Sequence, residues 1–259
     1  MQQPVTALEI AGLTKSFRPG RRALDGLSLT VPAGVVFGLV GLNGAGKTTT
    51  IRIVAGLERR DAGTVRLFGS PVEGLDVPHR RRIGFVLDEA LYFDWMPAGE
   101  YLDFIGTMHG LLPGQVEPRV AELLDFFDLT SHAAEPIGAF STGMKKKISL
   151  AAAVIHGPEL LILDEPLDGI DPVAAGAIKR TLGLMAARGG TVLITSHVLD
   201  TVEKLCSQIA IVHEGRTLLL CGTDEVRQRT TGSLTSGPLE ELFVELVASH
   251  LQTKSLSWL

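Results

Sequence analysis

The sequence predicts an α/β fold with a central, mostly parallel sheet, an N-terminal antiparallel β layer and an inserted helical subdomain. Apolar and polar residues alternate near the N-terminus, as in half-buried antiparallel strands, at Leu8, Ile10 and Leu13 and then at Leu27, Leu29 and Val31. Apolar runs at residues 35–40, 160–163 and 192–195 are typical of strands buried on both faces. Between residues 97 and 140, apolar side chains recur at helical spacing instead.

Composition limits the classes of function. The 259 residues are 45% hydrophobic and 20% charged, which suits one packed globular unit. The net charge is −5 and the longest basic block is the trio 145–147, so no nucleic-acid partner is expected. Cys206 and Cys221 fall outside any CxxC or zinc spacing, and we interpret them as reduced thiols of a cytosolic protein.

The sequence offers no membrane segment of its own. Residues 1–10 lack a basic region followed by an apolar stretch, so no secretory signal is expected. The apolar runs are less than half of the roughly 20 residues that a membrane helix needs. If the protein works at a membrane, we expect another chain to span it.

The segment GLNGAGKT, residues 41–48, matches the pattern GxxxxGK[ST] between a predicted strand and a predicted helix. Its glycines let backbone N–H groups face phosphate oxygens, Lys47 reaches the β and γ phosphates, and the Thr48 hydroxyl suits Mg²⁺. The alternative is a Gly-rich turn with an exposed lysine. We expect ATP and Mg²⁺ here, with nucleotide contacts from Gly41, Asn43, Gly44, Ala45, Gly46, Lys47, Thr48 and Thr49.

A second group of polar residues follows the apolar run 160–163. Asp164 and Glu165 come directly after it, at the sheet edge where open α/β folds bind ligands. Asp164 is expected to help hold Mg²⁺, and Glu165 to polarise the water that attacks the γ phosphate. An Asp-Glu pair in a solvated loop is the alternative.

The order of these segments resembles the nucleotide-binding subunit of ABC transporters over roughly residues 5–225. The matching segments are GLNGAGKT (41–48), FSTGM (140–144), LILDEP (161–166), GIDP (169–172) and TSH (195–197). The resemblance implies a P-loop NTPase of the ABC type. It also implies that two copies, or one copy and a homologous ATPase subunit, pair head to tail. Ser141 and Gly143 of each would then close over the ATP of the other.

The resemblance assigns roles to three further residues. His197 matches the family's switch histidine, which contacts the γ phosphate, and Phe17 lies where an aromatic ring stacks on adenine. Asp171 matches an aspartate that links the two sites across the dimer. The alternatives are a structural histidine, a core phenylalanine at a strand end, and a helix N-cap at Asp171 before Pro172.

The chain departs from the family pattern at one position. After the run 83–87 the family carries Gln or Glu, whereas this chain has Asp88 followed by Glu89. A carboxylate can ligate Mg²⁺, but Asp is one methylene shorter than Gln. Either Asp88 acts as the metal residue, through water, or Glu89 takes the role.

The segment STGM with three lysines, in place of the commoner SGGQ, resembles the ABC-2 branch, which favours export. Basic side chains near a helix start oppose the helix dipole, and we interpret Lys146 and Lys147 as a solvated polar face; a nearby phosphate that offsets their charge is the alternative. The stretch 91–97 carries Tyr92, Phe93, Trp95 and Met96. We expect Trp95 and Met96 to serve an interface with a membrane partner, and Tyr92 and Phe93 to pack the join between core and helices.

The expected organisation is a single ABC domain over residues 1–259. Residues 5–87 and 157–225 would form a RecA-like core with the β layer, and residues 88–156 the helical subdomain. Residues 226–259 would form a C-terminal helical extension, in which an apolar helix begins near Pro238.

The expected activity is ATP hydrolysis that powers a separate transmembrane permease from the cytoplasmic face. A soluble ABC-type ATPase of translation or DNA maintenance is the alternative, but such proteins commonly carry two cassettes or a long coiled coil. A catalytically weak binding module is disfavoured by the intact Lys47, Asp164, Glu165 and His197.

Overall fold

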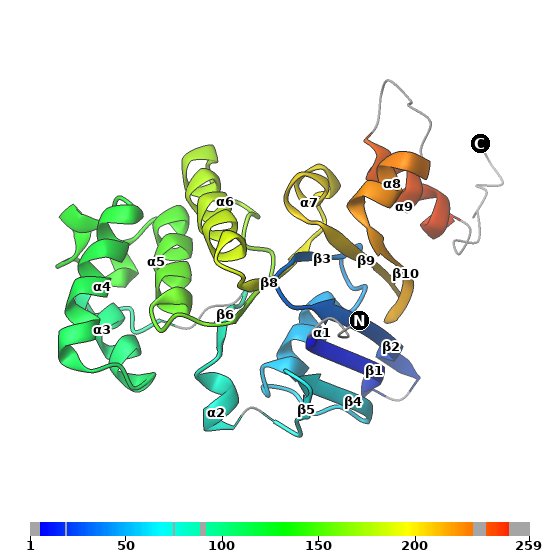
Figure 1. Ribbon diagram of the computed structural model, residues 1–259, viewed down its shortest axis with the longest axis horizontal. Helices are drawn as coiled ribbons and strands as arrows, with labels where there is room; N and C mark the ends of the chain where they lie inside the picture. Colours follow the sequence, from blue (N-terminus) through cyan, green and yellow to red (C-terminus); the bar gives the residue numbers. More distant parts are fainter. Residues whose placement is uncertain (1–5, 19, 75, 89–91, 230–236, 249–259) are drawn as a thin grey trace.

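The computed structural model describes residues 6–18, 20–74, 76–88, 92–229 and 237–248. In this part of the chain, two sheets and the helices around them occupy one side of the molecule, and a group of helices occupies the other (Figure 1). Among the described helices, none is long and apolar enough to cross a membrane.

The smaller sheet has four strands in the order β2-β1-β4-β5. These are β1 (Thr6–Arg18), β2 (Arg21–Pro32), β4 (Ala62–Leu67) and β5 (Ser70–Pro71). All pairings are antiparallel, which confirms the N-terminal β layer. The alternation in the sequence is explained by burial, because Leu8, Ile10 and Leu13 face the core.

The larger sheet has six strands in the order β10-β9-β3-β8-β7-β6. They are β3 (Val36–Val40), β6 (Ile83–Val86), β7 (Leu160–Leu163), β8 (Thr191–Ser196), β9 (Gln208–His213) and β10 (Arg216–Gly222). Only β10 pairs antiparallel, so the predicted mostly parallel sheet is confirmed. The three apolar runs of the sequence became β3, β8 and β7, which lie side by side at its centre.

The larger sheet separates two apolar cores. Alternate residues of β7 point to opposite faces, with Leu161 and Leu163 in one core and Leu160 and Ile162 in the other. The second core lies between the two sheets and includes α1 (Lys47–Val54). The first core includes buried residues of α6 (Pro172–Ala187), α7 (Leu199–Leu205), α8 (Thr223–Arg229) and α9 (Pro238–Ala248). Burial on both faces explains why the central strands read as unbroken apolar runs.

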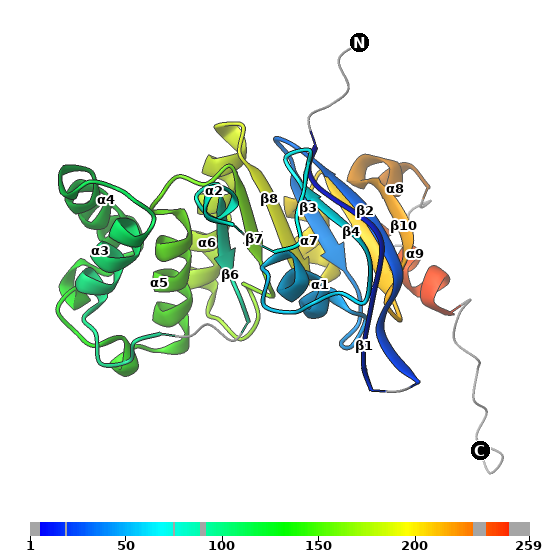
Figure 2. The same ribbon diagram turned by 90° about the horizontal axis from the view of Figure 1, so that it is seen from below.

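A group of helices follows β6 and the short helix α2 (Val77–Arg80). It comprises α3 (Ala98–Met108), α4 (Pro113–Phe126), the 3-10 turns Thr130–His132 and Ile137–Ala139, and α5 (Thr142–Val154). Figures 1 and 2 agree that α3, α4 and α5 lie at the end of the molecule away from the small sheet. Helix α5 lies closest to the core and packs against β6 and α6.

The C-terminal helix α9 begins at Pro238, as its sequence indicates. Leu239, Phe243 and Val247 are buried, and they come from the predicted apolar stripe. Helix α8 starts at Thr223, three residues before the expected boundary at 226. Residues 230–236 and 249–259 of the expected extension lie outside the described part.

Lys147 contradicts the interpretation of a solvated polar face. It is buried in α5, and its Nζ donates a hydrogen bond of 2.8 Å to the Phe127 carbonyl and lies 3.7 Å from Asp128 Oδ2. The ammonium thus joins α5 to the end of α4. Lysine can do this because its long apolar stem crosses the core before the charge reaches polar atoms.

Strand β6 and helix α5 approach closely at Gly84. A Cβ atom at Gly84 would lie 2.1 Å from the Ala153 carbonyl oxygen, so a side chain requires the helix to move. We expect Gly84→Ala to lower the free energy of unfolding by about 1–3 kcal/mol, because overpacking strains both elements. Denaturant unfolding measures the change.

The matched control is Gly183→Ala in α6, where an added Cβ meets no atom within 4 Å. It should raise the free energy of unfolding by about 0.5–1 kcal/mol, since alanine favours a helix over glycine. Equal stability of the two variants would contradict the close approach.

Candidate nucleotide-binding site

The loop between β3 and α1 is shaped to present its backbone to an anion. Gly46, the N-cap of α1, has a φ of 108°, and a Cβ there would lie 2.6 Å from Leu24 Cδ2. Only glycine fits this position. The first turn of α1 holds no acidic residue and no capping side chain. Its free N–H groups therefore form an anion site at the end of a buried strand.

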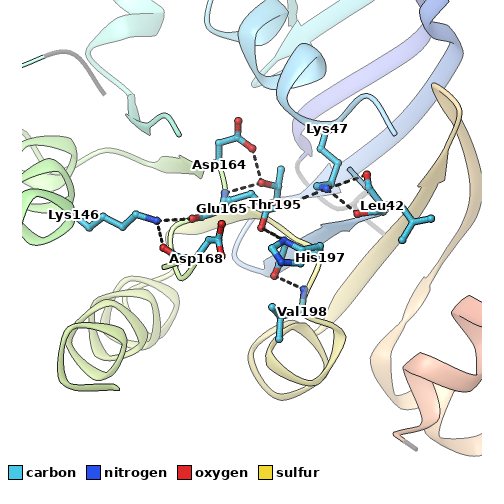
Figure 3. A network of polar contacts seen from close by, with 11 residues as sticks. Leu42, Lys47, Lys146, Asp164, Glu165, Asp168, Thr195, His197 and Val198 are labelled. Atoms are coloured by element: carbon cyan, nitrogen blue, oxygen red, sulfur yellow. Dashed lines mark hydrogen bonds and ion pairs between the residues drawn. The ribbon is translucent and has the colours of Figure 1, made fainter. Parts of the chain in front are cut away.

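Lys47 is held at the floor of this loop (Figure 3). Its side chain is only 5% exposed, and Nζ donates hydrogen bonds to the carbonyls of Gly41 at 2.7 Å and Leu42 at 3.4 Å. It also lies 3.2 Å from Glu165 Oε1. The alternative of an exposed lysine on a Gly-rich turn is wrong.

Asp164 is buried directly after β7. Its Oδ1 accepts a 2.6 Å hydrogen bond from Thr195 Oγ1, while Oδ2 is buried without a hydrogen-bond partner among the described residues. Burial raises the pKa of Asp164, and the hydrogen bond from Thr195 acts against this rise. One carboxylate oxygen is therefore left available to a cation.

Glu165 joins the neighbouring strand ends. Its Oε2 lies 3.1 Å from His197 Nδ1 and accepts a 3.3 Å hydrogen bond from the His197 backbone N–H, while Oε1 faces Lys47. The Glu165 N–H donates to Thr195 Oγ1 at 2.9 Å. Because β3, β7 and β8 are neighbours, their carboxyl ends bring these side chains into one cluster.

A cavity of about 650 Å³ opens over this cluster. Its lining includes many of the predicted site residues: Phe17, Asn43, Gly44, Ala45, Gly46, Lys47, Thr48, Thr49, Asp88, Glu165 and His197. Phe17 is 57% exposed at its rim, which rules out the alternative of a core residue. Asp88 is exposed beyond the end of β6, and Glu89 lies outside the described residues.

Five predicted residues lie outside this lining: Gly41 and Asp164, whose contacts are given above, and Ser141, Gly143 and Asp171. Ser141 is an exposed N-cap of α5, and its Oγ accepts a hydrogen bond from the Met144 N–H. Asp171 caps α6 through hydrogen bonds of 2.9 Å from Val173 and Ala174, so the helix N-cap interpretation of Asp171 is confirmed. Gly143 packs against the start of α6, where an added Cβ would lie 2.9 Å from Asp171 Oδ2.

Sequence reasoning missed Thr195 and Lys146 in this network. Thr195 is a polar residue inside an apolar run, directly before Ser196 and His197, and that was the available signal. Lys146 Nζ donates to the carbonyls of Glu165 and Asp168, so the expectation of a solvated Lys146 is also wrong. Nothing in its local sequence indicates those distant partners.

Comparison with known proteins decides the family. The model of the family described as ABC transporter matches residues 24–168. The daunorubicin/doxorubicin resistance ATP-binding protein DrrA of Streptomyces peucetius is 38% identical over 90% of this chain and 68% of its own length. The linearmycin resistance ATP-binding protein LnrL of Bacillus subtilis is 37% identical over 93% of this chain and 79% of its own.

The chain belongs to the ABC transporter family. A Nod factor export ATP-binding protein of Paraburkholderia xenovorans is also 38% identical, over 83% of this chain and 70% of its own length. A solved structure described as an ATP-binding subunit of an ABC transporter superposes with a TM-score of 0.83 at 30% identity, covering 93% of this chain and 99% of its own. As an ABC ATPase, the chain binds and hydrolyses ATP.

Lys47→Ala tests the cavity as the nucleotide site of this ABC ATPase. Without the ammonium, phosphate oxygens lose a buried cation, and we expect kcat/KM for ATP to fall by on the order of 100-fold. Steady-state ATPase assays measure this loss. Lys204→Ala is the matched control, since Lys204 pairs with Asp200 on α7 and does not line the cavity. Comparable loss in both variants would contradict the assignment.

Proposed function

We propose that this ABC ATPase powers a membrane exporter as one half of a head-to-tail ATP-sandwich dimer. The cluster of Lys47, Glu165 and His197 at the base of the cavity is the observation that carries the proposal. The similarity of the chain to drug-resistance and Nod factor export ATP-binding proteins supports export. No specific observation favours the alternative in translation or DNA maintenance.

The nucleotide would lie across the cavity from Phe17 to Lys47. The exposed Phe17 ring offers a face for adenine, which needs no base-specific hydrogen bond. Residues 43–49 supply backbone N–H groups and hydroxyls for the phosphates. Lys47 would exchange contacts with loop carbonyls for contacts with the β and γ phosphates.

The residues present fit Mg²⁺. Asp164 Oδ2 is a buried carboxylate oxygen to which no described residue donates a hydrogen bond, and Thr48, Asp88 and the cavity lie beside it. Among the described residues no three His, Cys, Asp or Glu side chains form a metal site, so the ion would be shared with phosphate oxygens. When bound, Mg²⁺ neutralises charge on the transferred phosphoryl group.

Glu165 is placed to act on water. Its carboxylate reaches into the cavity between Lys47 and His197, and it would accept a proton from, or orient, the attacking water. His197, at the end of β8, would keep this carboxylate aligned and reach the γ phosphate. The Thr195 hydroxyl ties the Asp164 side chain to the backbone of Glu165, because it donates to Asp164 Oδ1 and accepts from the Glu165 N–H.

The positions of Ser141, Gly143 and Asp171 support a dimer. All three were expected at an ATP site, yet none lines the cavity of its own chain. They gather at the adjoining N-termini of α5 and α6, where Ser141 and Asp171 are exposed. A second copy, or a homologous subunit, would present its ATP there. We also propose the organisation into a core at 5–87 and 157–225, a helical subdomain at 88–156 and a C-terminal extension at 226–259, with the last boundary moved to the start of α8 at Thr223.

Glu165→Gln tests hydrolysis and dimerisation together. The amide keeps the shape but cannot accept a proton, so we expect ATPase kcat to fall by roughly 10²–10⁴-fold. ATP should remain bound and hold two copies together, as measured by light scattering with Mg-ATP. The comparison variant is Asp168→Asn, because Asp168 is a neighbouring carboxylate that also lines the cavity. A Glu165→Gln protein that stays monomeric with saturating ATP would contradict the sandwich.

An exposed aromatic surface lies beside the helical group. Trp95 is 71% exposed, and the Phe93 ring lies 6.2 Å from it and 5.7 Å from Phe104. The expectation that Phe93 packs the join is therefore wrong. Met96 is partly buried and packs against the core. Tyr92 packs as expected and donates or accepts a 2.6 Å hydrogen bond with Ser149.

These contacts support a docking role for Trp95. Exposed aromatic clusters are costly in water and are typical of interface centres. We propose that the permease binds here and holds the ATPase at the cytoplasmic face of the membrane.

Trp95→Ala should weaken binding to the permease by about 1–2 kcal/mol, since it removes a large aromatic contact. Basal ATPase activity of the isolated subunit should be unchanged, because Trp95 does not line the cavity. Co-purification with the permease and transport in cells measure the effect. Val244→Ala is the control, because Val244 is 58% exposed on α9 at the other end of the molecule (Figure 1). Unchanged assembly in Trp95→Ala would overturn the docking role.

A further inference from the structure

Lys146 connects the helical group to the loop that carries Glu165. It lies in α5, and its Nζ donates hydrogen bonds to the carbonyl oxygens of Glu165 at 3.0 Å and Asp168 at 2.6 Å. Figure 3 shows the side chain reaching across from α5 to this loop, on the side opposite to Lys47. One ammonium thus bridges two carbonyls of a single turn, which is closed by the Asp168 N–H donating to Glu165 O at 3.2 Å.

The turn needs such support because Glu165 has an unfavourable backbone. Its φ is 45°, in the left-handed region that residues with a Cβ seldom adopt. Strained residues of this kind persist only where surrounding contacts determine them. Thr195 holds the Glu165 N–H and Lys146 holds the Glu165 carbonyl, so the peptide units on both sides of the strained Cα are fixed.

The charge of Lys146 fits this task. Hydrogen bonds from an ammonium are stronger than those between neutral groups. Burial lowers the pKa of Lys146, and the carboxylates of Asp168, Asp88 and Glu165 act in the opposite direction. The side chain is half-buried, and both of its hydrogen bonds go to the loop.

We propose that Lys146 is a positioning residue for ATP hydrolysis, which fixes the turn 165–168 and thereby aims the Glu165 carboxylate into the cavity. The inference rests on the proposed role of Glu165. It also gives a physical link between two ATP sites. Ser141, expected to meet the ATP of a second copy, caps the same helix that carries Lys146. A shift of α5 toward that ATP moves the contact that orients Glu165.

Lys146→Met tests the proposal, because methionine keeps the length of the side chain but donates no hydrogen bond. We expect ATPase kcat to fall roughly 10- to 100-fold, as small misplacement of a reacting group does, with the Kd for a fluorescent ATP analogue changed by less than about twofold. Lys146→Arg, which can donate to both carbonyls, should recover most of the activity.

Lys145→Met is the matched control. Lys145 is the preceding residue of α5, and its Nζ lies 3.9 Å from Asp94 instead of at the loop. It should hydrolyse ATP at the rate of the unmodified protein. The thermal midpoint of all variants should agree within about 2 °C, since a positioning role changes the turn and leaves the fold intact.

A double-mutant cycle separates positioning from a general structural role. If Lys146 acts through Glu165, adding Lys146→Met to Glu165→Gln should slow single-turnover hydrolysis by less than about twofold further. If the rate losses of Lys146→Met and Glu165→Gln multiply in full in the double variant, the inference is overturned. Wild-type kcat in Lys146→Met would also overturn it, as would a fall in kcat accompanied by equal losses of ATP affinity and thermal stability.

The same measurements distinguish this inference from the proposed function. Slow hydrolysis by Glu165→Gln with normal hydrolysis by Lys146→Met overturns the role of Lys146 alone. Normal hydrolysis by Glu165→Gln overturns the proposed role of Glu165, and the positioning role of Lys146 with it.

Discussion

The ion pair between Lys47 and Glu165 is the interaction around which the site is arranged. Their side chains are 5% and 13% exposed, and burying such charges is favourable only when they are paired and hydrogen-bonded. The parallel pairing of β3, β8 and β7 meets this condition, because it sets the phosphate loop, His197 and Glu165 at one edge. A phosphate group entering the loop competes for the same ammonium and would release the carboxylate toward water.

The sequence predicts this edge well because its signals are local. Apolar runs identify β3, β7 and β8, and the polar residues that end them identify Lys47, Asp164, Glu165 and His197. It predicts poorly wherever a side chain finds a partner far along the chain. Lys146 and Lys147 look solvated by charge alone, yet each donates to carbonyls about 20 residues away. Phe93, expected to be packed, is exposed, and Met96, expected at an interface, packs against the core. The sequence does not predict this, because burial in a segment without periodicity is set by tertiary packing.

Helix α5 contacts three neighbouring parts of the molecule, each through a different residue. Lys147 ties it to the end of α4, the backbone at Ala153 lies against Gly84 of β6, and Lys146 reaches the turn after β7. Its exposed N-cap, Ser141, remains available to a second subunit. Tight packing on several sides makes such a helix move as a unit, because close-packed interfaces transmit displacement instead of absorbing it.

The strained backbone of Glu165 makes its conformation depend on contacts from two parts of the fold. A residue held at a φ of 45° by Thr195 on one side and Lys146 on the other depends on both contacts, and they come from different parts of the fold. Thr195 belongs to β8 in the larger sheet, whereas Lys146 belongs to the helical group beyond β6. Relative movement of the two parts therefore bears on the carboxylate itself. If Glu165 is the catalytic group, as we propose, its carboxylate would respond to the position of α5, which a glutamate in a relaxed loop would not do.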